Sequence, residues 1–183
     1  MRRTVTRTVG FLALVISMAL PLPVSAVSGF GDVPIDAFYT SPIQWMVDQG
    51  ITTGTSSTCF SPGDPVTRGQ AAAFLWRMEG SPTGAPAHGF TDVVAPWQQE
   101  PISWMSAAGI TTGTTATTFS PGAPVTRGEV AAFLHRLAGS PEAPAPTQFT
   151  DVIAPWQITP VGWMVQVGIT TGPRAAPSLP RSM

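Results

Sequence analysis

The sequence contains no lysine, one cysteine and two histidines among its 183 residues. The single cysteine, Cys59, excludes an internal disulfide scaffold and any cysteine-rich metal site. A free cysteine behaves as a small hydrophobe, so we expect Cys59 to be buried; pairing with another molecule is the alternative. His88 and His135 have no counterparts at metal-ligand spacing, and we predict neither a metal nor a cofactor.

Catalytic motifs are equally scarce. The chain has no Gly-x-Ser-x-Gly element and no paired catalytic carboxylates, which predicts a protein that is not an enzyme. It also lacks a basic patch: residues 27–183 carry six arginines against ten acidic residues, a net charge of −4. This balance argues against a nucleic-acid partner.

No apolar run is long enough for a typical membrane span. Residues 9–20 are apolar, but a spanning helix needs about 20 such residues. Arginines precede this run and Val24-Ser25-Ala26 follow it, a pattern typical of a cleaved secretory signal. We therefore predict a signal peptide over residues 1–26, rather than a membrane anchor, and no membrane contact after cleavage.

An internal repeat dominates the remainder. Three tryptophans stand 59 residues apart at Trp45, Trp104 and Trp163. The blocks that recur with them are Phe-x-Asp-Val at residues 30–33, 90–93 and 149–152, and Gly-Ile-Thr-Thr-Gly at 50–54, 109–113 and 168–172. The predicted units are residues 27–80, residues 81–139, a partial unit over 140–172 and an unrelated tail over 173–183. A frameshift, an early stop or a naturally degenerate terminal repeat would each explain the tail.

Each unit reads as two helices joined by a turn-rich loop, which predicts a mainly α fold. Proline favours the first position of a helix and glycine the residue after its end. The first helices are therefore expected to start at Pro42, Pro101 and Pro160 and to end before Gly50, Gly109 and Gly168. Because no second helix follows the third of these, we expect it to lack a packing partner and the protein to have low stability.

The second helices carry stronger start signals. Thr67 with Gln70, and Thr126 with Glu129, have the spacing of a capping box. Apolar residues then recur at helical offsets 0, 3, 4 and 7 and indicate one buried face. Neither helix can bury this face alone, so the repeats are expected to pack on one another.

These motifs resemble the S-layer homology domain. The family repeat has Phe-x-Asp-Val, an aromatic residue before the first helix, Gly-Ile-x-x-Gly, Phe-x-Pro, and a tetrapeptide like Thr-Arg-Ala-Glu. Here the aromatic position is occupied by Phe38, Trp97 and Trp156, and the tetrapeptides are residues 67–70 and 126–129. Glycine replaces the usual alanine, and a third tetrapeptide is missing.

The resemblance implies tandem helix-loop-helix repeats packed as a pseudo-threefold prism, here with an incomplete third repeat. It also implies ligand grooves between repeats that bind secondary cell-wall polysaccharide, often through a ketal-pyruvate group. With one tetrapeptide missing, at most two of three grooves keep their arginine. The chain is expected to be secreted to the cell wall or cell surface, and self-association stays open.

The candidate ligand residues begin with the tetrapeptides. Capping explains Gln70 and Glu129, but an arginine faces the positive end of the helix dipole. Arg68 and Arg127, beside free N–H groups, would form anion sites. Gly69 and Gly128 would let a ligand approach the backbone. The alternative is a solvated arginine or a pair with an acid such as Asp32 or Asp92.

Aromatic and acidic residues complete the set. Tryptophans can stack on sugar rings, but packing between repeats is the favoured explanation, because an aromatic residue at helical spacing usually belongs to the core. Aspartates before turns usually satisfy backbone N–H groups, and hydroxyl binding is the alternative. The residues in question are Trp45, Trp104, Trp97, Trp156, Asp32 and Asp92.

The sequence thus predicts a non-catalytic cell-wall anchoring module. A protein-interaction or structural module, and a remnant of a longer exported enzyme or adhesin, are the alternatives.

Overall fold

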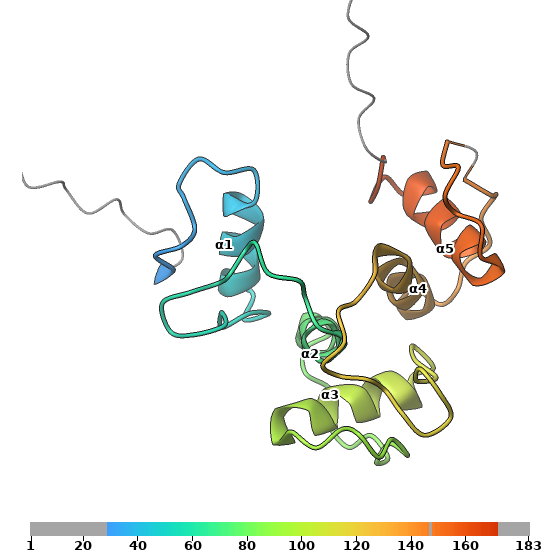
Figure 1. Ribbon diagram of the computed structural model, residues 1–183, viewed down its shortest axis with the longest axis horizontal. Helices are drawn as coiled ribbons and strands as arrows, with labels where there is room; N and C mark the ends of the chain where they lie inside the picture. Colours follow the sequence, from blue (N-terminus) through green and yellow to red (C-terminus); the bar gives the residue numbers. More distant parts are fainter. Residues whose placement is uncertain (1–28, 147, 172–183) are drawn as a thin grey trace, which may run out of the picture.

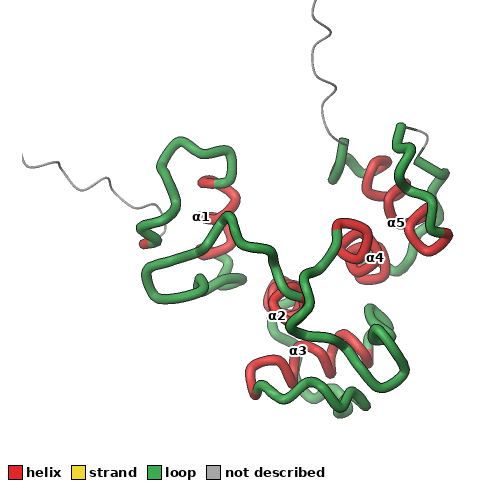
Figure 2. Tube along the Cα trace, viewed as in Figure 1, coloured by secondary structure: helices red, strands yellow, loops and turns green. Residues whose placement is uncertain are grey.

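The computed structural model describes residues 29–146 and 148–171. The predicted signal peptide and the tail over residues 173–183 lie outside this part. Its regular secondary structure is helical, joined by long loops (Figure 2). The helices are α1 (Thr40–Asp48), α2 (Arg68–Met78), α3 (Pro96–Ala107), α4 (Arg127–Leu137) and α5 (Pro155–Gln166). The predicted mainly α class, with tandem helix-loop-helix repeats, is confirmed.

Both predicted capping boxes are present at the second helices. At α2, the Thr67 hydroxyl accepts from the Gln70 N–H and the Gln70 side chain accepts from the Thr67 N–H, at 3.2 and 2.9 Å. Thr126 and Glu129 repeat this exchange at α4, at 3.2 and 2.8 Å. Each box satisfies two of the backbone donors that a helix start leaves unpaired.

The first helices begin earlier than predicted. α3 starts at Pro96 and α5 at Pro155, so that Pro101 and Pro160 lie inside these helices. The earlier prolines occupy the favoured first position themselves. The inner prolines remove one helical hydrogen bond each, but both are buried, and their packing offsets that loss. The predicted ends are confirmed: Gly50, Gly109 and Gly168 follow the helices with φ of +67°, +70° and +76°.

Each second helix covers the first helix of the following repeat. α2 packs on α3 and α4 packs on α5, and no other pair of described helices packs closely (Figure 1). The expectation that the third first helix lacks a partner is therefore wrong, because α4 reaches across to α5. Within the described chain, the first helix without a helical partner is α1.

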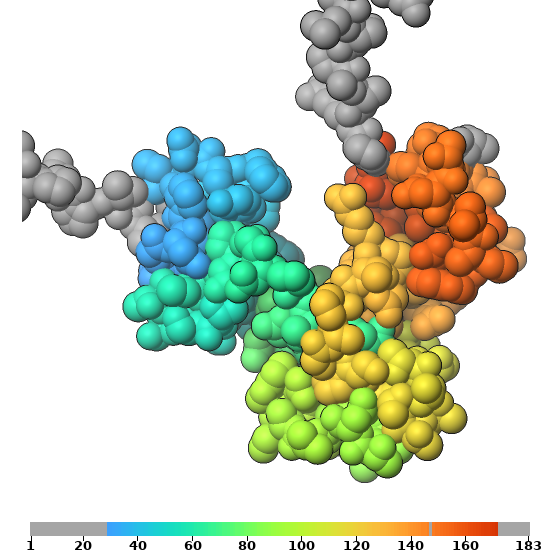
Figure 3. Space-filling model, viewed as in Figure 1, coloured from blue at the N-terminus to red at the C-terminus, as the bar shows by residue number. Residues whose placement is uncertain are grey.

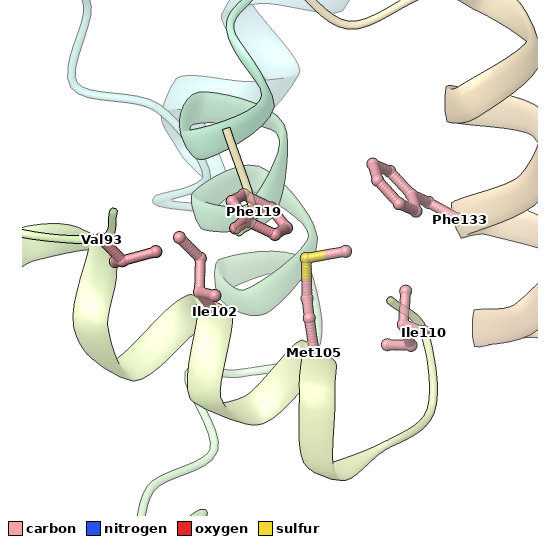
Figure 4. Close-up of a cluster of buried hydrophobic side chains, with 7 residues drawn as sticks. Val93, Ile102, Met105, Ile110, Phe119 and Phe133 are labelled. Atoms are coloured by element: carbon pink, nitrogen blue, oxygen red, sulfur yellow. The ribbon is translucent and has the colours of Figure 1, made fainter. Parts of the chain in front are cut away.

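The main core lies where α2, α3 and α4 meet. Its buried members come from two repeats, so this core joins repeat 1 to repeat 2. They are Ala72, Val93, Ile102, Met105, Ile110, Phe119 and Phe133 (Figure 4). A smaller cluster of Phe30, Val33 and Ile43 holds the loops around α1. The space-filling view accordingly separates an α1 lobe from the α4–α5 lobe, with α2 and α3 between them (Figure 3).

Cys59 is less buried than predicted. Its side chain is half-buried, and its Sγ lies 3.8 Å from the Thr58 hydroxyl on an exposed loop.

Candidate functional site

The starts of α2 and α4 are tied together by backbone hydrogen bonds. The Arg68 N–H donates to the Ala123 carbonyl and the Gly69 N–H to the Pro121 carbonyl, both at 2.9 Å. The Val125 N–H returns a bond of 2.9 Å to Val66. The predicted free N–H groups at the start of α2 are therefore absent, since the next repeat already uses them. An anion site built on that backbone is excluded.

The Arg68 side chain crosses from repeat 1 into repeat 2. It is 4% exposed, and its Nε donates to the Phe119 carbonyl at 2.8 Å. Its Nη1 forms an ion pair with Glu129 Oε1 at 2.5 Å. The guanidinium carbon also lies 4.8 Å from the ring centroid of Phe119 and 5.4 Å from that of Phe133. Arg68 is therefore paired with an acidic residue, as the alternative interpretation proposed, but the partner is Glu129 rather than Asp32 or Asp92.

Glu129 is held in its ionised form. Burial by itself would raise the pKa of this carboxyl group. Hydrogen bonds from the Thr126 N–H and hydroxyl, together with the Arg68 charge, outweigh burial and lower the pKa below its usual value. The lowered pKa keeps the Glu129 carboxyl group ionised at neutral pH, beside the Arg68 guanidinium.

A groove of about 370 Å³ opens beside this ion pair. We name it the repeat-2 groove, and it is lined by Arg68, Thr111, Thr112, Gly113, Thr114, Glu129, Ala132, Phe133, Arg136 and Trp156. Its volume falls within the about 300–1,000 Å³ typical of small-molecule sites. Because two guanidinium groups face one carboxylate, the lining carries net positive charge.

Arg136 approaches the groove from the opposite end of α4. Its Nη1 donates to the Ile110 carbonyl at 3.0 Å, which fixes the guanidinium beside the loop after α3. That loop contributes Thr111 to Thr114, and Trp156 enters from the start of α5 with 48% of its surface exposed. The groove thus combines cations, hydroxyls and an accessible aromatic ring.

Of the predicted ligand residues, Arg68, Glu129 and Trp156 meet in the repeat-2 groove. Arg127 does not line it: this side chain is exposed at the start of α4 and forms no ion pair with the described residues. Arg68 lies at the start of α2 in repeat 1 but lines the groove of repeat 2. By the same offset, Arg127 at the start of α4 would correspond to a groove in repeat 3.

The tetrapeptide glycines have a packing role. A Cβ atom on Gly69 would collide with the Gln98 side chain, and one on Gly128 with Gln157. In the structure these glutamine side chains, from the covered first helices, lie over the two backbones, and the approach of a ligand there stays a prediction. Gln70 is taken up by its capping box.

The aspartates hold the Phe-Ser-Pro turns. Asp32 accepts from the N–H groups of Phe60 and Ser61 at 2.9 and 2.7 Å, and Asp92 does the same for Phe119 and Ser120. The hydrogen bond from the Phe60 N–H is the largest influence on the pKa of Asp32, and it lowers this pKa. For Asp92, burial opposes the shift, and the two turn N–H groups outweigh burial. The turn interpretation is confirmed, and neither carboxylate lines the groove.

The other tryptophans lie elsewhere. Trp104 packs against the main core, in agreement with the packing alternative. Trp97 is 51% exposed on α3, and Trp45 is 52% exposed on α1 beside a second cavity.

Sequence reasoning missed Arg136, Phe133 and the threonines of the groove. A signal existed, since Arg136 recurs as Arg77 at the repeat spacing, and the Arg77 Nη1 likewise donates to the Ile51 carbonyl at 3.1 Å.

The model of the S-layer homology domain matches residues 29–72 and 89–131. The chain contains S-layer homology domains. This match and the similarity to surface-layer proteins support a cell-surface anchoring module with a secreted, cell-surface location. The boundaries of the repeats and the partial third repeat over residues 140–172 stay predictions from the sequence repeat.

Several relatives are surface-layer proteins. The S-layer protein of Bacillus thuringiensis subsp. finitimus is 28% identical over 93% of this chain, and the surface-layer 125 kDa protein of Lysinibacillus sphaericus is 30% identical over 77%. An endoglucanase of Bacillus sp. (strain KSM-635) is 36% identical over 58%. The chain spans only 21%, 12% and 11% of these relatives' lengths.

Two negative observations apply to the described residues alone. None of their helices combines the length and apolar character needed to cross a bilayer. No group of three or more histidine, cysteine or acidic side chains in this part is placed to hold a metal ion.

Proposed function

We propose that the repeat-2 groove binds an acidic sugar of a secondary cell-wall polysaccharide and so anchors the protein without catalysis. The observation that carries the proposal is the convergence of Arg68, Arg136 and the exposed ring of Trp156 on one groove. A guanidinium group suits a carboxylate, a ketal-pyruvate group or a phosphate on the polymer. An aromatic face suits the sugar ring beside it.

Glu129 tunes this preference. It neutralises Arg68, whose guanidinium is buried and bonded to Phe119 and Glu129, and this leaves Arg136 as the cation for the ligand. The Thr111–Thr114 loop adds hydroxyl groups that match sugar hydroxyls in hydrogen-bonding capacity. The expected ligand therefore carries one acidic group beside a neutral ring.

The repeat-2 groove combines this chemistry with an arginine of a tetrapeptide. Arg68 is the only arginine of the two tetrapeptides that lines a described cavity. We therefore expect this groove to bind one segment of the polymer.

The test is a pulldown of the mature protein, residues 27–183, on purified cell walls with and without their secondary polymer. We expect retention only when the polymer is present. Trp156→Ala should reduce retention at least fivefold, whereas Trp97→Ala, which removes an equally exposed tryptophan from the matching position of α3, should not. Retention that survives polymer removal would instead support a protein-interaction module.

A further inference from the structure

The loop after α3 brings three threonines to the repeat-2 groove. They are Thr111, Thr112 and Thr114. A threonine hydroxyl can donate one hydrogen bond and accept two. The hydrogen bonds that each hydroxyl already makes therefore decide which of the three is left for a ligand.

The Thr114 hydroxyl is used by the loop itself. It donates to the Thr118 carbonyl at 3.2 Å, and the Thr118 hydroxyl lies 3.0 Å from it. The Ser120 hydroxyl approaches it at 2.8 Å. Since its single hydrogen already has an acceptor, the two neighbouring hydroxyl groups donate to its oxygen, which then has no lone pair left. Thr114 therefore offers a ligand no further hydrogen bond.

Thr111 is unsuitable for a different reason, which is burial. It is 3% exposed, and its hydroxyl accepts from the Gly113 N–H at 3.1 Å. Its own N–H donates to the Met105 carbonyl at 3.2 Å and so ties the loop to α3. Thr111 therefore fixes the shape of the loop and presents little of its side chain to the groove.

Thr112 lies between these fixed residues and is exposed. Its side chain lines the groove, and its hydroxyl forms no hydrogen bond with the described residues. The Arg136 guanidinium is held close by, because its Nη1 donates to the carbonyl of Ile110, two residues before Thr112. A hydroxyl on a loop that is already ordered loses little conformational freedom when it binds.

The same distribution of hydroxyl groups occurs in repeat 1. Thr52 is 5% exposed, and the Thr55 hydroxyl donates to the Cys59 carbonyl at 3.2 Å. Thr53, the counterpart of Thr112, is exposed and likewise forms no side-chain hydrogen bond within the described part of the chain. In both repeats the loop thus leaves the second threonine of Gly-Ile-Thr-Thr-Gly free.

We propose that Thr112 is a specificity-determining residue of the repeat-2 groove, where its hydroxyl bonds a free sugar hydroxyl beside the acidic group held by Arg136. The inference rests on the proposed function and narrows its ligand class. The ligand is an acidic sugar that keeps an unsubstituted hydroxyl next to its acidic group. A sugar that is acylated at that hydroxyl cannot donate to Thr112 and is bound more weakly.

The test is isothermal titration of solubilised secondary cell-wall polymer into the mature protein and three variants. Thr112→Val keeps the shape of the side chain and removes the hydroxyl, so we expect about fivefold weaker binding, the effect of one hydrogen bond. Thr112→Ser restores the hydroxyl and should bind within about twofold of the wild type. Thr53→Val makes the same change at the matching exposed position of repeat 1 and should leave binding unchanged.

A second titration needs no variant. Polymer whose free hydroxyl groups have been chemically acetylated should bind the wild type at least fivefold more weakly, with a smaller loss for Thr112→Val. Equal affinities of the wild type and Thr112→Val, or equal losses in Thr112→Val and Thr112→Ser, would overturn the proposal. The wall-binding role of the groove would still stand in those cases if Trp156→Ala weakened binding, whereas a folded wild type that binds no polymer would overturn both.

Discussion

The buried Arg68 should contribute far more to stability than its repeat counterpart Arg127. Arg68→Ala removes the hydrogen bond to Phe119 and leaves the Glu129 carboxylate, whose side chain is 26% exposed, without its cation. Breaking a buried ion pair by deleting one partner costs about 3–5 kcal/mol. Partial exposure of Glu129 and its bonds to Thr126 reduce this, so we expect a loss of about 2–4 kcal/mol.

Thermal unfolding followed by circular dichroism measures this effect. For a chain of this size, about 3 kcal/mol corresponds to a fall in Tm of roughly 6–12 °C. Arg127→Ala removes the same side chain from an exposed position and should change stability by less than about 0.5 kcal/mol. Arg68→Lys, which keeps the charge but loses the planar group that stacks on Phe119, should fall between them. Equal effects of the two alanine variants would refute the assigned burial and pairing of Arg68.

Three further predictions concern packing, turns and pH. Gly69→Val should cost about 1–3 kcal/mol in urea unfolding, because the Gln98 side chain must move aside and the Pro121 carbonyl oxygen lies only 3.1 Å from the added Cβ atom. Gly63→Val, in open space, should cost less than about 0.5 kcal/mol. Asp92→Ala should destabilise the protein by about 1–3 kcal/mol, since it frees two turn N–H groups and the left-handed Ser120 with φ of +60° loses its support; unchanged urea stability would contradict this. Because folding lowers the pKa values of Asp92 and Glu129, their stabilisation is present at neutral pH and should be lost as pH falls from about 5 through the folded values; a Tm that stays constant between pH 7 and pH 3 would contradict the shifts.

Local signals in the sequence predicted the second helices well. A capping box involves residues three apart, so Thr126 and Glu129 suffice to locate the start of α4 without knowledge of the fold. The start of α3 was misplaced because two prolines, Pro96 and Pro101, both satisfy the local rule for a first helical residue. In the structure Pro96 takes the first position, and Pro101 lies buried inside α3.

The repeated sequence pattern does not predict where the arginine side chain of each tetrapeptide lies. Every local feature of Arg68 is shared with Arg127, yet one is buried and the other exposed. The difference arises because α2 crosses into the next repeat, where Phe119 and Glu129 receive its guanidinium. Contacts of this kind, over about 50–60 residues of sequence, depend on how the repeats stack rather than on periodicity. For the same reason, the sequence spacing did not predict that Arg136 of α4 and Trp156 of α5 line the same groove.

The uncovered face of α1 follows from the same offset. Since a second helix covers the first helix of the next repeat, the first helix at the N-terminal end of the described chain has no preceding helix to cover it. Sequence reasoning assigned the lack of a partner to the third repeat because it paired helices within a repeat. Because of this offset, the uncovered first helix is α1 rather than α5, and Arg68 of repeat 1 lies in the groove of repeat 2.

The most direct test of the central claim is isothermal titration of solubilised secondary cell-wall polymer into the mature wild-type protein, Trp156→Ala and Trp97→Ala. The account predicts saturable binding to the wild type with one site per chain, at least fivefold weaker binding to Trp156→Ala, and unchanged binding to Trp97→Ala. No heat of binding to a folded wild-type sample, or equal affinities for the two variants, would contradict the repeat-2 groove as the wall-binding site.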